Sequence, residues 1–471
     1  MSRTIELQPM EGSSTHHRMV TLKDKSKEEH SAEHDEQDIE QTVSVPDSDD
    51  ESHDVYPEGG LRAYLVVLGG FFGCIVNLGV LNSIGAVQMW VSGHQLKYYS
   101  ASTISWIFSI YLALTYMLAI IAGPIFDRYG PRHIMIVSAL LMFGGLMGVA
   151  SATELWQFAL GFICLGTGNG LGMSPSISTL SHWFFEKRGT MVGFATSGGS
   201  VGGLVFPLML RYAYSKYGFE WAIRILAFTT LGCMVVATAL VKERFRRSPS
   251  QMSENHRSTS KWGHLKSKVS LKFLVELDRR YWILVAGGFF AELSLVLIMT
   301  YFSTYCIAKG QTESTSLLLV TVWNATGIPG RIVPNFVSDY LGRFNMNVAM
   351  ILGYTIVIWA VWLPLGHLVG ALYAFAAIGG FFSGSILSLL PACLSQITPV
   401  REIGIRYGIV NFVLSIANLF GVPIASAIIG QGTSSDYDKF VIFVACLATA
   451  GLVLWYVDRG AVAGYKVNIK V

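Results

Sequence analysis

The sequence predicts an all-α membrane protein with twelve transmembrane helices in two pseudo-symmetric bundles of six. Three observations lead to this fold class. Of the 471 residues, 52% are hydrophobic and only 14% are charged, whereas soluble proteins carry about 25% charged residues. Apolar segments of about twenty residues, long enough to cross about 30 Å of hydrocarbon, recur along the chain. A similar charged turn also appears once in each half of the sequence.

The apolar segments form two sets separated by short polar breaks. The first set covers residues 64–91, 103–126, 133–151, 155–178, 189–211 and 220–241. The second set covers residues 281–303, 314–337, 347–365, 370–393, 407–430 and 439–457. We therefore expect an N-terminal six-helix bundle over residues 58–241 and a C-terminal six-helix bundle over residues 281–457.

Three polar stretches flank the bundles. Residues 1–57 are rich in Ser, His, Glu and Asp and have too few apolar side chains to fold, so they predict a disordered acidic tail. This tail is either a regulatory segment with phosphorylation or ubiquitin sites or a solvated extension, and it lacks the apolar core of a signal peptide. Residues 242–280 are rich in Lys and Arg and predict a basic linker, and residues 458–471 predict a short C-terminal tail.

The distribution of basic residues predicts the orientation, because Lys and Arg accumulate in cytoplasmic loops. The basic loops carry Arg128, Arg132, Lys187, Arg188, the linker, Arg343, Arg401 and Arg406. The opposite loops carry little more than Lys97, Lys216 and Lys309. We expect both termini and the linker to be cytoplasmic, and the plasma membrane rather than the vacuolar membrane as the location.

The charged turns are the most informative motif. The first reads Gly123-Pro-Ile-Phe-Asp127-Arg128-Tyr-Gly130-Pro-Arg132, and the second reads Asn335-Phe-Val-Ser-Asp339-Tyr-Leu-Gly342-Arg343. Carboxylates at helix ends can bond the N-termini of neighbouring helices and nearby Arg side chains. We therefore predict a cytoplasmic gate formed by Asp127, Arg128, Arg132, Asp339 and Arg343. The alternative is that these charges only determine the topology.

Two further motifs support a family resemblance. Glu58-Gly59-Gly60 precedes the first span, and Trp183-Phe-Phe-Glu-Lys-Arg-Gly189 leads into a glycine-rich fifth span. Together with the first charged turn, they resemble the monocarboxylate porter family of the major facilitator superfamily, in its fungal branch, over residues 56–457. The resemblance implies an alternating-access carrier in which two bundles rock about a central site. The chain departs from well-studied animal members of the family at Asn82 and Gly327, where those members have Lys and Asp.

Charged residues inside the spans are candidates for the transport path, because they are costly at membrane depth. Arg331 matches the substrate-carboxylate-binding Arg of the resembled family, and a guanidinium can bind a carboxylate with two hydrogen bonds. The alternatives for Arg331 are a snorkelling or gate-pairing role. Glu292 lies in an apolar run that favours its neutral form, so it is the candidate for proton coupling. It is alternatively a structural partner of Arg331.

Polar neutral side chains are abundant in the spans and suit a larger, more neutral solute. We predict substrate contacts by Asn82, Asn169, Asn324 and Asn411, with a helix-helix hydrogen bond as the alternative for each. Tyr111, Tyr116 and Trp323 are further candidates for the lining of a central cavity.

These features predict a transporter of a small organic solute, namely a monocarboxylate or related organic anion, with the bilayer as its environment and protons as the candidate coupling ion. The alternatives are efflux of a secondary metabolite, uptake of a vitamin-like compound, and a non-transporting nutrient sensor. Catalytic, cofactor-binding and metal-binding motifs are not found, and the 6 cysteines occur singly. The net charge of +3 and the basic residues confined to loops argue against a nucleic-acid partner.

Overall fold

The computed structural model describes residues 57–99, 101–244, 278–399, 402–430 and 432–463, and within these ranges all regular structure is helical. The described residues all belong to one compact unit. The predicted acidic tail, apart from Pro57, lies outside the described residues, as do most of the predicted linker and residues 464–471.

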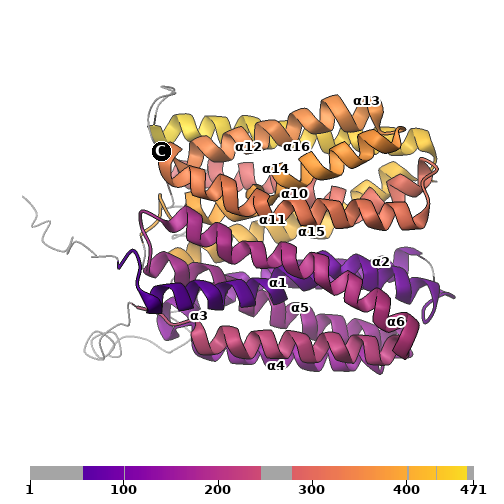
Figure 1. The fold of residues 1–471 in the computed structure, drawn as a ribbon, viewed down its shortest axis with the longest axis horizontal. Coiled ribbons are helices and arrows are strands. Elements are labelled where there is room, and N and C mark those ends of the chain that lie inside the picture. Colours follow the sequence, from indigo (N-terminus) through magenta and orange to yellow (C-terminus); the bar gives the residue numbers. More distant parts are fainter. Residues whose placement is uncertain (1–56, 100, 245–277, 400–401, 431, 464–471) are drawn as a thin grey trace, which may run out of the picture. The chain divides into compact units, whose positions relative to one another are not determined.

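The N-terminal bundle contains helices α1 to α6, drawn in indigo to magenta in Figure 1. Its elements are α1 (Leu61–Gly93), α2 (Ala101–Met117), α3 (Ala119–Tyr129), α4 (Pro131–Ala150), α5 (Leu155–Ser178), the 3₁₀ turn η1 (Thr179–His182) and α6 (Arg188–Leu240). Helices α2 and α3 together cover the second predicted span. Helix α6 covers the fifth and sixth spans, and its backbone leaves helical geometry at Gly218, where φ is 77°. Glycine is the residue that adopts this conformation without strain.

The C-terminal bundle completes the unit. Its elements are α10 (Arg279–Ala308), α11 (Glu313–Leu341), α12 (Arg343–Val357), the π-helical turn η3 (Ile358–Trp362), α13 (Leu363–Leu365), α14 (Val369–Leu394), α15 (Ile403–Ile429) and α16 (Ser434–Ala463). Helix α16 is longer than the predicted span, so residues 458–463 of the expected tail are helical. Asp458 and Arg459 are buried there, and Arg459 Nε donates a hydrogen bond of 2.6 Å to Asn345 Oδ1 on α12.

Nine helical stretches of the described residues are long and apolar enough to cross a membrane. These nine count α6 once, although it covers two predicted spans, and they do not include α5 or α11. The structure is therefore consistent with the twelve predicted spans. Helix α11 is less apolar than the other spans because it carries Asn324, Arg331, Asn335 and Asp339.

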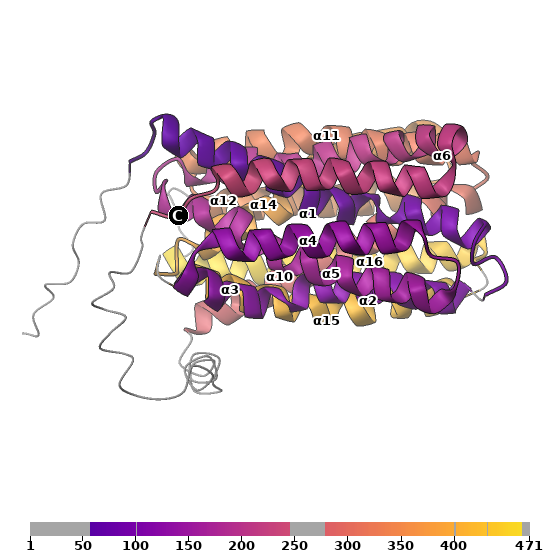
Figure 2. The same cartoon turned by 90° about the horizontal axis from the view of Figure 1, so that it is seen from below.

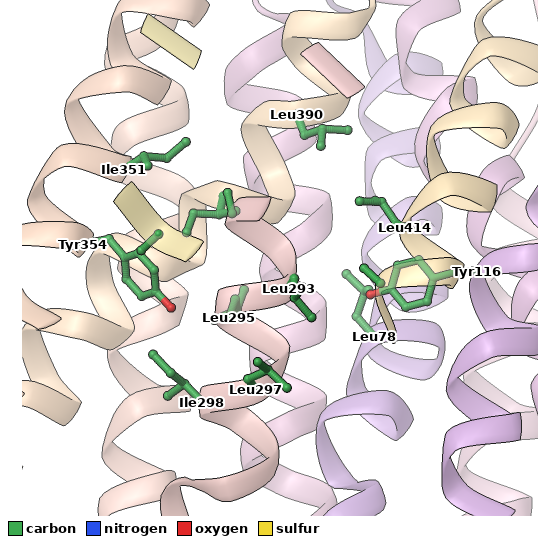
Figure 3. Packing of buried hydrophobic residues seen from close by; sticks show 14 of the residues in the cluster. Leu78, Tyr116, Leu293, Leu295, Leu297, Ile298, Ile351, Tyr354, Leu390 and Leu414 are labelled. Atoms are coloured by element: carbon green, nitrogen blue, oxygen red, sulfur yellow. The ribbon is translucent and has the colours of Figure 1, made fainter. Parts of the chain in front are cut away.

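The two bundles lie side by side and share an apolar core. Figures 1 and 2 show α6 next to α11 and α2 next to α15, and these helices are also in contact across the interface. One buried cluster includes Leu78 and Tyr116 of the N-terminal bundle together with Leu293 and Leu414 of the C-terminal bundle, as Figure 3 shows. Apolar side chains from both bundles therefore fill part of this interface.

Close helix contacts depend on a few glycines at the interface. A Cβ atom on Gly123 of α3 would lie 2.1 Å from the Gly404 carbonyl oxygen on α15. A Cβ atom on Gly193 of α6 would lie 2.4 Å from the Arg331 carbonyl oxygen on α11. These backbones approach closely because no side chain separates them. Both contacts lie at the end of the bundles that carries the charged turns, which we call the signature end.

Candidate functional site

A small cavity lies between the two bundles. It is lined by Leu78, Tyr116, Met173, Ile177, Glu292, Leu387, Leu390, Tyr407, Asn411 and Leu414. It leaves about 10 Å³ of room for the centre of a water molecule, which is about what a single water requires. A solute the size of a metabolite does not fit into the cavity in this conformation.

The structure places Glu292 in this cavity. Its side chain is 2% exposed, and Oε1 has no hydrogen-bond partner among the described residues. Tyr116 and Tyr407, which also line the cavity, interact electrostatically with this carboxyl group. The hydroxyl group of Tyr116 is close enough to interact with this carboxyl group, and Oε1 is the oxygen that is available to a proton, a water molecule or a polar group of a solute.

Arg331 lies at the same interface but is not part of the cavity wall. Its Nη1 donates a hydrogen bond of 2.9 Å to the Thr196 carbonyl oxygen on α6, across the interface. The side chain is 4% exposed, and Nε has no hydrogen-bond partner among the described residues. Within the same residues no ion pair joins Arg331 to Glu292, so the structural pairing considered above is not formed in this conformation.

The four predicted asparagines are in three different places. Asn411 lines the cavity, and its Nδ2 donates to the Tyr407 carbonyl oxygen at 2.7 Å. Asn82 and Asn324 face each other across Gly203, where a Cβ atom would lie 2.8 Å from an atom of each. Asn169 lies within the N-terminal bundle and donates to Tyr111 Oη at 2.9 Å. Only Asn411 is therefore brought together with Glu292.

The two charged turns make equivalent contacts at the signature end. The Asp127 carboxylate on α3 accepts hydrogen bonds from the backbone N–H groups of Gly404 and Ile405 at 3.1 and 2.9 Å. The Asp339 carboxylate on α11 accepts from the N–H groups of Gly189 and Thr190 at 2.8 and 2.7 Å. Each acid thus binds the N-terminus of a helix in the opposite bundle, where unpaired N–H groups and the helix dipole favour negative charge.

In both charged turns a glycine stands three residues after the aspartate, and its backbone conformation explains this spacing. Gly130 follows α3 with φ of 77°, and Gly342 follows α11 with φ of 99°. Glycine adopts positive φ without a steric penalty, so each chain can turn sharply into the next helix. The turns therefore hold Asp127 and Asp339 at matching positions, as the repeated sequence predicts.

The predicted basic gate residues behave differently from one another. Arg343 Nη2 donates to the Phe185 carbonyl oxygen of the opposite bundle at 2.6 Å, and Arg343 Nε lies 3.9 Å from Asp339 Oδ1. Arg128 instead lies over the ring of the neighbouring Tyr129, at 5.3 Å from its centroid. Arg132 is exposed at the start of α4.

Two residues contribute to the gate or the cavity although the sequence did not single them out as site residues. Arg188 is 1% exposed, and its Nη1 donates to the Ser395 carbonyl oxygen of the opposite bundle at 2.9 Å. In the sequence it stands out only as a basic loop residue and as part of the aromatic-Lys-Arg motif. Tyr407 lines the cavity, but a tyrosine at the start of an apolar run carries no signal that distinguishes this position.

A buried histidine lies beside these contacts. His182, in the turn after α5, is 6% exposed, and its ring centroid is 5.5 Å from that of Phe126. Burial, and to a smaller extent the charge of Arg188, lower the pKa of His182 from 6.5 to about 4. The imidazole is therefore neutral at physiological pH and adds no positive charge beside Arg188.

Comparison with known proteins agrees with this arrangement. Residues 63–367 match the family model described as Major Facilitator Superfamily. The chain belongs to the major facilitator superfamily. Members of this superfamily and the relatives below are transporters and not enzymes, and the chain is a transporter of the same kind.

Relatives of this facilitator have different solutes in their names. The riboflavin transporter MCH5 of Saccharomyces cerevisiae is 39% identical, over 91% of this chain and 84% of that protein. The fujikurins efflux protein of Gibberella fujikuroi is 31% identical, over 85% of this chain and 83% of that protein. The proton:xylose symporter XylE matches with a TM-score of 0.61 at 14% identity, over 83% of this chain and 94% of that chain, which supports the fold alone.

Proposed function

We propose that this transporter carries a neutral, planar heterocyclic solute of the vitamin type by alternating access. The observation that carries the proposal is the composition of the cavity wall. Among the described residues, this wall contains two tyrosines, one asparagine and one acid, but no Lys, Arg or His. Aromatic faces and a few hydrogen-bonding groups in an apolar wall suit a flat ring system better than a small anion.

The comparisons support the same solute class. The relative that is 39% identical is named a riboflavin transporter, and riboflavin has a neutral, planar ring system. Relatives at lower identity are named for the efflux of secondary metabolites. We therefore treat export of an aromatic metabolite as the second candidate, with the same cavity and the opposite direction.

Arg331 supports a monocarboxylate as an alternative solute. Its guanidinium is buried, and no carboxylate in the described part of the chain forms an ion pair with it. A separation of α6 from α11 would break its bond to Thr196 and free donors for an anionic group. An anionic solute would therefore bind between α6 and α11 rather than beside Glu292.

We further propose that Asp127 and Asp339 close the signature end and that this end faces the cytosol, as the basic loops predict. Breaking their bonds to α15 and α6 would open the cavity on that side. In this scheme Glu292 carries the coupling proton, since it is the acid in the cavity wall. Protonation would remove a buried charge before the empty carrier reorients.

The test is transport by proteoliposomes containing the full chain. Labelled riboflavin, labelled lactate and a labelled neutral sugar should be measured for uptake and efflux, with and without a pH gradient. We expect saturable riboflavin transport that Arg331→Ala changes little. Lactate transport that disappears in Arg331→Ala would instead establish the monocarboxylate function, and transport of riboflavin only outward would establish efflux.

A further inference from the structure

Glu58 makes an unusual contact just before α1. Its Oε1 accepts hydrogen bonds from the backbone N–H groups of Phe185 and Glu186, at 2.5 and 2.9 Å, and its Oε2 accepts from that of Lys187 at 3.2 Å. These donors are consecutive residues of the loop between η1 and α6. One carboxylate therefore fixes three successive peptide groups of this loop.

The backbone around Glu58 is bent in a way that favours this contact. Glu58 has φ of 49°, and it is the only non-glycine residue with positive φ in the part of the chain that the structure describes. Gly60, with φ of 91°, completes the bend before α1 begins at Leu61. A strained conformation of a non-glycine residue persists when surrounding contacts hold it, and such residues gather at functional sites.

The loop held by Glu58 also contacts the opposite bundle. The peptide group between Phe185 and Glu186 donates its N–H to Glu58, and its carbonyl oxygen accepts a hydrogen bond from Arg343 Nη2. The charge of Glu58 also acts on Arg343. Arg343 in turn lies beside Asp339, which binds the first residues of α6. Glu58 thus orients the peptide group through which Arg343 joins the two bundles.

The acid that precedes the first helix of the C-terminal bundle makes a different contact. Asp278 directly precedes α10. Its carboxylate accepts a hydrogen bond from the backbone N–H of Arg280 at 3.5 Å, and its Oδ2 lies 3.8 Å from Nε of the Arg280 side chain. In the described residues it therefore caps its own helix. The contact made by Glu58 is an addition to the gate and does not follow from the repeated fold.

We propose that Glu58 is a positioning residue of the gate at the signature end. Its carboxylate holds residues 185–187 so that the Phe185 carbonyl meets Arg343, and this contact favours the state in which the bundles are closed at that end. Loss of the carboxylate shifts the equilibrium toward the open state. The proposal rests on the alternating access proposed above, but not on the identity of the solute.

The test measures the distance across the signature end in the full chain. Spin labels on exposed positions of the two bundles, His133 on α4 and Leu341 on α11, report closed and open populations in liposomes without any solute. The variants are Glu58→Gln, the conservative Glu58→Asp, and Glu186→Gln as a control in the same loop. We expect Glu58→Gln to raise the open-to-closed ratio about tenfold, since several charge-assisted hydrogen bonds are weakened.

Two further variants distinguish a positioning role of Glu58 from a merely structural one. We expect Glu58→Asp to restore most of the closed population and Glu186→Gln to leave the ratio unchanged. Glu58→Gln and Arg343→Gln should be non-additive in a double-mutant cycle, because both side chains bind the peptide group between Phe185 and Glu186. An unchanged ratio in a stably folded Glu58→Gln protein, or an equal shift in Glu186→Gln, would overturn the proposal. If the distances shift as expected but riboflavin is not transported, the solute assignment fails and the role of Glu58 stands.

Discussion

Replacement of Asp339 by asparagine tests the proposed gate most directly. The carboxylate accepts three hydrogen bonds from the start of α6: two from backbone N–H groups, at 2.8 and 2.7 Å, and one from Thr190 Oγ1 at 2.6 Å. Its side chain is only 8% exposed, so solvent screens these bonds little. Asparagine keeps the shape and one oxygen acceptor but removes the negative charge.

The expected cost follows from these bonds. A hydrogen bond to a charged group contributes about 1 kcal/mol more than one between neutral groups. Three such bonds give about 3 kcal/mol, to which the α6 helix dipole adds a fraction of a kcal/mol. Since every 1.4 kcal/mol is a factor of ten, Asp339→Asn should raise the open-to-closed ratio about a hundredfold. Thr190→Val removes only the hydroxyl bond to this carboxylate, which contributes about 1.5 kcal/mol, so it should raise this ratio about tenfold.

Reaction of a cysteine in the cavity measures this ratio. Met173→Cys places a thiol in the cavity wall, at a position that is 4% exposed, after the 6 native cysteines are replaced by alanine. If opening is fast, the alkylation rate follows the open population. The order expected is Asp339→Asn fastest, Thr190→Val intermediate and the parent slowest. Rates within threefold of one another, in variants with equal thermal stability, would refute the view that this contact closes the cavity.

Three further predictions follow from buried groups. Glu292→Gln should abolish the stimulation of transport by a pH gradient while solute exchange without a gradient continues, as counterflow in proteoliposomes would report; full stimulation would contradict a proton role. Gly404→Ala should weaken closure, because its Cβ would lie 2.4 Å from Asp127 Oδ1, and faster alkylation of the cavity thiol would confirm this. Because the pKa of His182 is about 4 when folded and 6.5 when unfolded, stability present above pH 6.5 should fall by about 3 kcal/mol as the pH drops through 4. His182→Gln should reduce this loss in thermal unfolding at pH 7 and pH 4.5.

Much of the fold could be predicted because hydropathy and helix breakers report it directly. The predicted span 155–178 coincides with α5 (Leu155–Ser178). The predicted break between residues 211 and 220 is present, but as a change of direction at Gly218 rather than as a separate loop. The end of α16 was underestimated, because Asp458 and Arg459 look like tail residues until their burial in the C-terminal bundle is known.

The site was harder to predict because its residues come from six different helices. The repeated turns indicated Asp127 and Asp339, since their charge and spacing are visible in the sequence. The cavity wall depends on which face of each helix turns inward, which only the packing of neighbouring helices decides. For this reason Asn169, which bonds Tyr111 inside one bundle, could not be distinguished from Asn411, which lines the cavity.

The departure at Asn335 shows what the repeated turns require. In the first turn, Gly123 allows α3 to approach Gly404 of the opposite bundle. In the second turn the glycine that allows the close approach lies on the opposite helix, α6: a Cβ on Gly193 would lie 2.5 Å from Asn335 Cβ. Asn335 is then free to donate to Ser388 Oγ and to the Arg331 carbonyl oxygen, at 2.6 and 2.7 Å. The repeat therefore preserves the close helix contact rather than the glycine, and the side chain that replaces it ties the backbone of Arg331 to α14.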